Sequence, residues 1–224
     1  MSQLQQLLQE ADLKRQQQIK NPEHNLLSNS LQNTKYQFLS DSLAFLNCTL
    51  SPSAICLILG YSEAFDYMLS FTKKEPFEIT EETIKNMHSL IFSHFPERLK
   101  TEYRTVPFQE KEFGYRSPSP NDLTHVMRHF TDQYRSSCTT LHPIELCAMM
   151  TKRFLDIHPF MEGNEAIAFL LMNAILLHHG YPIIAIPLSL REQFLSALNL
   201  ARTEYDMDPL CILFSKLVLA SYHE

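Results

Sequence analysis

The 224-residue sequence predicts an all-α domain, a bundle of about eight helices that carries one small β-hairpin. Three observations support this fold class. The chain has only four glycines, far fewer than average usage gives, and its apolar residues recur at intervals of three and four. Capping residues also stand where several of these periodic stretches begin. So few glycines exclude a Gly-rich phosphate loop and argue against a turn-rich all-β fold or a doubly wound nucleotide fold.

The composition also narrows the function. The formal net charge is -6 and the Lys and Arg residues are dispersed, so we do not expect nucleic acid as the main partner. The five cysteines include no CxxC pair, which indicates reduced thiols. The longest apolar run, residues 166–177, is interrupted by Asn173 and is shorter than the roughly 20 residues of a membrane span. The Gln-rich N-terminus does not resemble a secretory signal. We therefore expect a cytoplasmic bacterial protein without a membrane span, kept in its own cell or delivered into a host cell.

The first third of the chain is expected to hold three helices. An amphipathic helix of about five turns is predicted by apolar residues at helical spacing, namely Leu4, Leu7, Leu8 and Ala11. Residues 20–34 are polar and turn-prone and are expected to form a connection. Residues 35–70 hold two further helical stretches, which separate near Ser51 and Pro52.

The middle of the chain is expected to contain the hairpin. Thr80 before Glu81 and Glu82 predicts a helix start, because a hydroxyl caps the helix and acids favour its positive end. Residues 101–116 place apolar side chains on both sides of the polar sequence QEKE, which predicts a short hairpin. The sequence SPSP at 117–120 is expected to end the hairpin and to begin another helix.

The last third is expected to be the most apolar part of the bundle. A turn over residues 158–163 leads into a long apolar helix that runs to about residue 179, and Gly180 is expected to cap it in a left-handed conformation. Further helix starts are expected at Pro143, at Ser189 with Glu192 in capping-box spacing, and at Asp208 with Pro209.

The turn HPFMEGN at residues 158–164 carries the residues that suggest chemistry. It delivers polar groups onto a helix N-terminus, whose unpaired N–H groups and positive dipole end favour an anion such as phosphate. Gly163 and Asn164 tolerate a left-handed φ, so the turn can curl its N–H groups around the anion. Glu162 adds a hard oxygen ligand of the kind that Mg²⁺ prefers, and His158 can act as a general base near neutral pH.

This turn resembles the start of the signature HPFx[DE]GNGRxxR of the Fic (filamentation-induced-by-cAMP) family. Further segments resemble Fic landmarks in the same order, namely SEAFDY at 62–67, ITEETI at 79–84, EYRTV at 102–106, PSP at 118–120, and LMNA at 171–174 with GYP at 180–182. The resemblance covers roughly residues 60–215. It implies a Fic domain over 60–224, all-helical with a β-hairpin flap, behind an N-terminal helical extension over 1–59.

The resemblance implies an enzyme that transfers AMP, or a related phosphate-containing group, from ATP or another nucleotide to a Ser, Thr or Tyr hydroxyl of a target protein. His158 would deprotonate that hydroxyl, Glu162 would hold Mg²⁺, and Gly163 and Asn164 would cradle phosphates, beside Glu165. Phe160 would anchor the turn in the core. The flap would dock the protein substrate by strand addition, through the residues Thr105, Val106, Pro107 and Phe108. A homodimer is compatible with this interpretation.

The sequence departs from the signature directly after Asn164. Glu165 stands at the glycine position, and Ala166 and Phe169 replace the two arginines that contact the outer phosphates in the family. Arg–phosphate contacts are charge-assisted, and neither Ala nor Phe replaces them. Triphosphate binding should weaken unless another cation compensates, for which Lys152 and Arg153 are candidates by sequence proximity.

A second departure accompanies the first. Residues 42–47 align with the inhibitory helix [ST]xxxE[GN] of many Fic proteins, but Leu46 stands at the position of its glutamate, which pairs with the second arginine in the family. Because both partners are then apolar, we expect Leu46 to pack near Phe169.

Three further interpretations compete with the transferase. The first is a binding module that keeps the fold but has lost phosphate chemistry. The second is an AMP-removing hydrolase, in which Glu165 would replace the acid that is missing at Leu46. A metal hydrolase based on His178 and His179 is disfavoured, since adjacent helical residues point about 100° apart.

Overall fold

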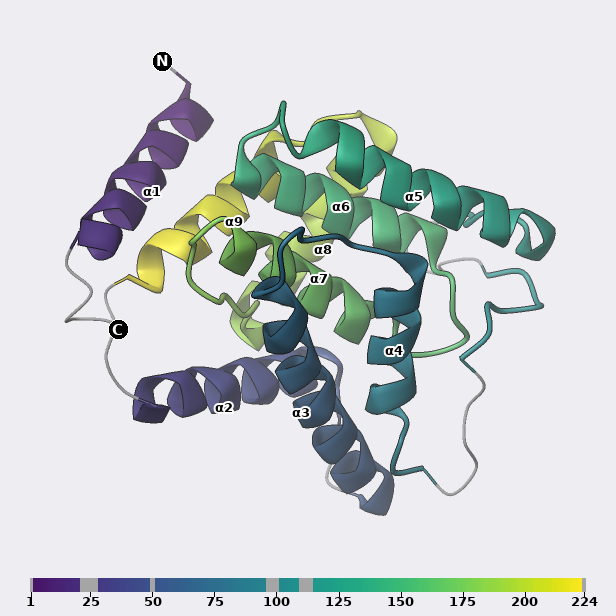
Figure 1. Ribbon diagram of the computed structural model, residues 1–224. Helices are drawn as coiled ribbons and strands as arrows, with labels where there is room; N and C mark the ends of the chain where they lie inside the picture. The colour runs from purple at the N-terminus through teal and green to yellow at the C-terminus, as the bar shows by residue number, and fades with distance from the viewer. Residues whose placement is uncertain (1, 21–27, 49–50, 96–100, 109–114, 223–224) are drawn as a thin grey trace.

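A computed structural model describes residues 2–20, 28–48, 51–95, 101–108 and 115–222 (Figure 1). Its described residues form nine α-helices and two short 3-10 helices. The helices are α1 (Gln3–Lys20), α2 (Ser28–Phe45), α3 (Pro52–Thr72), α4 (Glu81–Ile91), α5 (Leu123–Ser137), α6 (Pro143–Ile157), α7 (Asn164–His178), α8 (Arg191–Thr203) and α9 (Asp208–Ala220), with the 3-10 helices η2 (Pro120–Asp122) and η3 (Leu188–Leu190). The predicted all-α class is confirmed.

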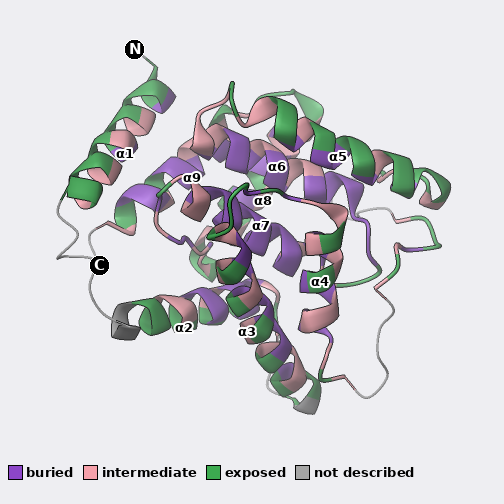
Figure 2. Cartoon of the chain, viewed as in Figure 1, coloured by how far each residue is buried: buried purple, intermediate pink, exposed green. Residues whose placement is uncertain are grey.

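Helix α7 lies at the centre of the bundle (Figure 2). Almost all of its residues are buried, because its sequence is apolar on every face. It packs against α6, which precedes it across a tight turn, and against α3 and α4. Helix α5 covers the outer side of α6, and α9 packs on both α6 and α8. This arrangement places the turn between α6 and α7 at the start of the most deeply buried helix.

Several helix starts follow from local chemistry. The Thr80 hydroxyl accepts a hydrogen bond from the Thr83 N–H at 3.1 Å, and the Thr83 hydroxyl accepts one from the Thr80 N–H at 3.0 Å. The Ser51 hydroxyl accepts from the Ala54 N–H at 3.1 Å, so α2 and α3 separate at the predicted point. Pro143 begins α6, where the missing N–H costs nothing. Gly180 follows α7 with φ at +78°.

Two boundaries differ from the sequence prediction. The segment 28–34, expected as a connection, belongs to α2, since extending a helix over polar residues costs little once its apolar end is packed. The expected capping box at Ser189 and Glu192 does not form. Instead η3 leads into α8, which begins without a side-chain cap.

The expected β-hairpin at residues 105–116 is not seen. Residues 109–114 lie outside the described residues, and the described residues on either side form no extended strand. Thr105, Val106 and Pro107 are exposed, whereas Phe108 turns inward and is half-buried.

Helix α3 contains a stretch, Ser53–Thr72, that by length and composition alone could cross a membrane, and 39% of it is buried in the bundle. Core helices meet the same criterion. Here α3 packs against α4 and α7 and gives Tyr61, Phe65 and Met68 to the core. The proposed boundary at residue 59 falls within this helix.

Helix α1 is attached at the edge of the bundle, where it lies along α9 (Figure 1). The Tyr181 hydroxyl donates to Asp12 at 2.5 Å, and the Arg15 guanidinium donates to the His179 carbonyl at 3.0 Å. Polar contacts therefore hold α1 against the end of α7.

Candidate active site

His158 occupies the sharp reversal between α6 and α7. Its backbone is left-handed, with φ at 47° and ψ at 62°, a conformation that is uncommon outside glycine and costs free energy. Its side chain is 8% exposed. The surrounding structure must therefore hold this residue in place, which is typical of functional sites.

A buried arginine holds the reversal. The Arg104 side chain is 3% exposed, and its guanidinium donates to four backbone carbonyls, those of His158 at 2.8 Å, Val106 at 2.9 Å, Pro118 at 2.6 Å and Ile157 at 3.4 Å. Two of these carbonyls belong to the negative C-terminal end of α6, where a cation is favourable. Arg104 thus ties α6, the base of the expected flap and residue 118 together.

The His158 imidazole is neutral at pH 7. Burial lowers its pKa to about 4, and the positive charges of Arg104 and Arg202 act in the same direction. The Phe108 ring stacks on it with a centroid separation of 3.5 Å and an interplanar angle of 4°. A neutral imidazole can accept a proton, and the aromatic ring shields one of its faces from water.

Asn164 closes the turn. Its side-chain carbonyl accepts from the Phe160 N–H at 3.0 Å, and its amide donates to the Phe160 carbonyl at 2.9 Å. Phe160 itself is fully buried, and its ring stacks on His88 at 4.1 Å. Both polar groups of the Asn164 side chain are thus hydrogen-bonded to the backbone within the turn.

Gly163 needs its small size. Its φ is +79°, and a Cβ there would lie 2.8 Å from the Phe92 ring. The turn therefore curls closely against the C-terminal end of α4, directly before α7, whose first N–H groups have no acceptor within the helix.

Two carboxylates flank the N-terminus of α7. Glu162 is exposed and Glu165, in the first turn of the helix, is half-buried. The described residues contain no group of three or more His, Cys, Asp or Glu that could hold a metal ion. The donor set therefore fits a Mg²⁺ that takes one or two carboxylates, waters and substrate phosphates, and not a closed metal centre.

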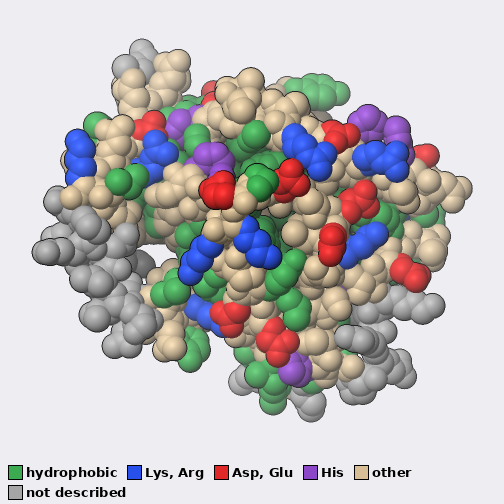
Figure 3. Space-filling view, in the orientation of Figure 1, with side chains coloured by type: hydrophobic (Ala, Val, Ile, Leu, Met, Phe, Trp, Pro, Cys, Tyr) green, Lys and Arg blue, Asp and Glu red, His purple; other side chains and the backbone are tan. Residues whose placement is uncertain are grey.

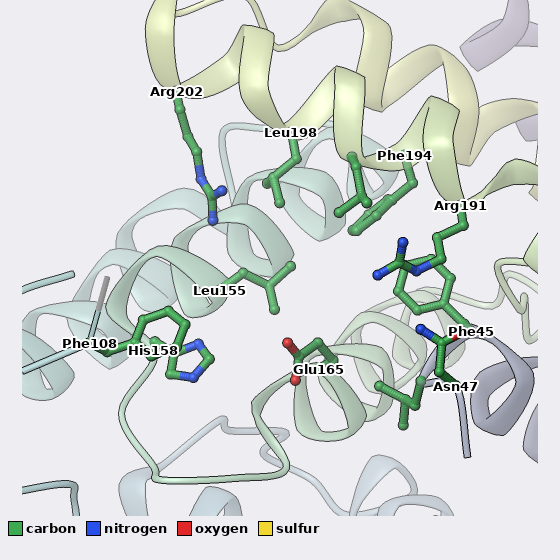
Figure 4. A pocket seen from close by; sticks show the side chains of 12 residues that line it. Phe45, Asn47, Phe108, Leu155, His158, Glu165, Arg191, Phe194, Leu198 and Arg202 are labelled. Atoms are coloured by element: carbon green, nitrogen blue, oxygen red, sulfur yellow. The ribbon is translucent and has the colours of Figure 1, made fainter. Parts of the chain in front are cut away.

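His158 opens into a pocket of about 300 Å³, at the lower end of the roughly 300–1,000 Å³ range of ligand sites (Figure 4). Glu165 lines the pocket, together with residues of α6 and α8 and the end of α2. A second pocket of about 360 Å³ on the other side of Glu165 contains Glu162 and Gly163. Glu165 thus lies between the two cavities, with the base in one and the exposed acid in the other.

The sequence profile of the Fic/DOC family matches residues 78–176, which include this turn. The chain is 33% identical over 153 residues, 68% of its length, to "Protein adenylyltransferase Fic" of Drosophila willistoni. The chain belongs to the Fic family. The alignment covers 30% of that relative, so this chain spans only part of the length of the curated Fic proteins it matches.

Solved Fic structures share the fold. A Fic domain containing signaling protein from Bacteroides thetaiotaomicron superposes with a TM-score of 0.85 at 20% identity, over 97% of this chain and 95% of that one. Fic-1 from C. elegans gives a TM-score of 0.85 at 21% identity, over 98% of this chain and 71% of that one. Nearly the whole chain is thus arranged as in these Fic proteins.

The positions of the two Fic arginines have become part of the core. Ala166 and Phe169 are each 1% exposed. The Phe169 ring meets the Phe45 ring edge-on at 5.1 Å, and Phe194 packs against both. Phe45, the residue before Leu46, thus makes a ring contact with Phe169, and Leu46 itself lines both pockets. A direct contact between Leu46 and Phe169 stays a prediction.

Neither Lys152 nor Arg153, the two candidates for a compensating cation, is among the residues that line the pocket. Lys152 forms an ion pair with Asp156 at 2.7 Å and does not line the pocket. The pocket receives Arg191 and Arg202 instead, both from α8. No local sequence signal marks them, because they lie far along the chain from the Fic turn and reach it only through the packing of α8.

The remaining histidine pair lies elsewhere. The His178 ring stacks on Phe77 at 4.3 Å, and His179 Nδ1 lies 2.9 Å from the Ile175 carbonyl oxygen. Neither residue lines either pocket. On the face seen in Figure 3, acidic and basic side chains are interspersed without a large patch of one sign.

Proposed function

We propose that this chain transfers AMP, or a related phosphate-containing group, from a nucleotide to a hydroxyl of a target protein. The observation that supports the proposal is that a buried, neutral His158 and Glu165, in the first turn of α7, line one pocket. The name of the Drosophila relative, a protein adenylyltransferase, supports the same chemistry.

The residues divide the reaction between them. The His158 imidazole takes the proton of a Ser, Thr or Tyr hydroxyl, and that oxygen forms a bond to the α-phosphorus while the bond to the leaving pyrophosphate breaks. The N–H groups at the start of α7 hold the phosphate oxygens. Bound phosphate charge favours the imidazolium and so raises the pKa of His158 from its low value in the empty pocket.

Glu162 and Glu165 would hold Mg²⁺ together with the donor, and the ion would neutralise phosphate charge. The Arg104 guanidinium, which donates to both the His158 and the Val106 carbonyls, would hold His158 in a fixed position relative to residues 105–108. We also propose that residues 105–108 dock the target segment, because Phe108 of this segment already contacts the base. Strand addition at this point would tolerate varied target sequences.

A binding module is the second candidate. It is favoured by the burial of Ala166 and Phe169 at the arginine positions and by the Phe108 ring stacked on His158. An AMP-removing hydrolase would use the same pocket, with Glu165 orienting water.

A labelling assay separates these functions. The protein is incubated with Mg²⁺, cell lysates and a panel of α-labelled nucleotides, beside His158→Ala and the matched control His125→Ala, an exposed histidine on α5. Label transferred by the wild type and by H125A but not by H158A supports the transferase. Equal label with H158A, or no label with any donor from folded protein, contradicts it, and release of AMP from a labelled target protein would identify the hydrolase.

A further inference from the structure

Arg191 is the first residue of α8, and its guanidinium points into the pocket (Figure 4). Within the part of the chain that the structure describes, no acceptor bonds to its buried Nε atom, and no carboxylate forms an ion pair with it. A buried donor without an acceptor destabilises the fold. Something other than stability must therefore account for this side chain.

The position on the helix adds to that cost. The N-terminus of a helix is its positive end, where a cation is unfavourable. The guanidinium carbon lies 5.5 Å above the centroid of the Phe45 ring, so a cation–π contact fixes its direction without neutralising its charge.

The guanidinium lies close to the place where the Fic arginines would act. The Phe45 ring that it covers is 5.1 Å from the Phe169 ring, and Phe169 occupies the second arginine position of the motif. In Figure 4 the Glu165 carboxylate lies between His158 and Arg191. Arg191 of α8 thus places a positive charge at the end of the pocket near Phe169, where α7 lacks the arginine of the family motif.

The second arginine of the pocket is committed elsewhere. Arg202 Nε donates to Asp156 Oδ1 at 2.7 Å, and these side chains are 5% and 3% exposed. The Arg202 guanidinium also lies 4.5 Å above the Tyr115 ring. Asp156 therefore holds the Arg202 guanidinium in an ion pair, whereas no carboxylate of the described residues forms an ion pair with Arg191.

We infer that Arg191 binds a phosphate group of the nucleotide donor, in place of the two arginines that the family carries on α7. The inference rests on the proposed function for the identity of the donor. A guanidinium can bind one phosphate bidentately, and the N–H groups of α7 can hold the next. Because Glu165 repels bare polyphosphate, the ligand is a diphosphate or triphosphate group with its Mg²⁺.

Binding of inorganic tripolyphosphate in excess Mg²⁺, measured by titration calorimetry on the full chain, tests the inference. We expect Arg191→Ala to weaken binding about 10-fold to 100-fold, as for other lost charge-assisted contacts. Arg191→Lys keeps the positive charge but loses the planar guanidinium that can bind phosphate bidentately, so it should weaken tripolyphosphate binding less than Arg191→Ala does. Arg128→Ala, which removes an exposed cation of α5, is the matched control and should bind as the wild type does.

The free proteins provide a second readout. Because no described residue accepts a hydrogen bond from Arg191 Nε, R191A should unfold at the same urea concentration as the wild type or at a higher one. Loss of binding without loss of stability supports a ligand-binding role. Equal binding by wild type and R191A, or no binding by the wild type, overturns the inference.

Parallel labelling separates this inference from the proposed function. Arg191-dependent tripolyphosphate binding without transfer of label would leave the phosphate site intact and would refute the transferase. Transfer of label at equal rates by wild type and R191A would refute the role of Arg191 and would leave the transferase intact.

Discussion

Arg104→Met is the substitution that most directly tests how the site is held. Methionine keeps much of the length of the side chain but removes every donor. Four backbone carbonyls would then lose the guanidinium, and two of them lie at the C-terminal end of α6. The backbone hydrogen bond from the Arg104 N–H to the Pro159 carbonyl, at 2.8 Å, would remain.

The magnitude follows from these contacts. A hydrogen bond to a charged group contributes about 1.5–3 kcal/mol, but the four bonds are not additive, and removal of a buried charge recovers some desolvation. We expect the free energy of unfolding to fall by about 3–5 kcal/mol, less than the sum of four such hydrogen bonds. Arg104→Lys, whose ammonium has three donors and no planar fork, should lose about half as much.

Urea unfolding followed by circular dichroism measures this change, and the absence of tryptophan makes the helical signal the natural probe. A second readout distinguishes positioning from mere stability. In R104M the pKa of His158 should rise from about 4 towards its ordinary value, because burial loosens and the charge of Arg104 is gone. The resonance lost in H158A identifies this ring in the NMR titration of the ten histidines. A stability within 1 kcal/mol of wild type and an unchanged pKa would refute the reasoning.

Two further predictions concern the core around the site. Burial lowers the pKa of His88 to about 4. Between pH 6.5 and pH 4 the unfolded chain therefore binds more protons than the folded one, so the free energy of unfolding decreases as the pH is lowered. From pH 7 to pH 5 this amounts to about 2 kcal/mol, a loss that His88→Gln should remove; an unchanged difference between the two pH values would contradict it. Phe169→Ala should lower the free energy of unfolding by about 3–4 kcal/mol, because it leaves a cavity among Phe45 and Phe194, while Phe169→Leu loses less. A loss below 1 kcal/mol in a denaturant titration would mean that this motif position is not part of the core.

The helix starts show where sequence reasoning succeeds. Thr80, Ser51 and Pro143 mark the beginnings of α4, α3 and α6 because a cap or a proline acts on residues within one turn. The same reasoning fails at Ser189, where a 3-10 turn precedes α8, and in segment 28–34, which joins α2. In both places the packing of a neighbouring apolar stretch outweighs the local preference.

The sequence by itself determined the all-α class, the Fic turn at residues 158–164 and the replacement of its two arginines. These features depend on residues that are neighbours in the chain, so spacing and residue type are enough to reveal them. Only the tertiary structure decided that Arg104 caps α6, that Phe108 covers His158, and that Arg191 enters the pocket. Each of these contacts joins segments far apart in the sequence, and their meeting depends on how α2, α6, α7 and α8 pack.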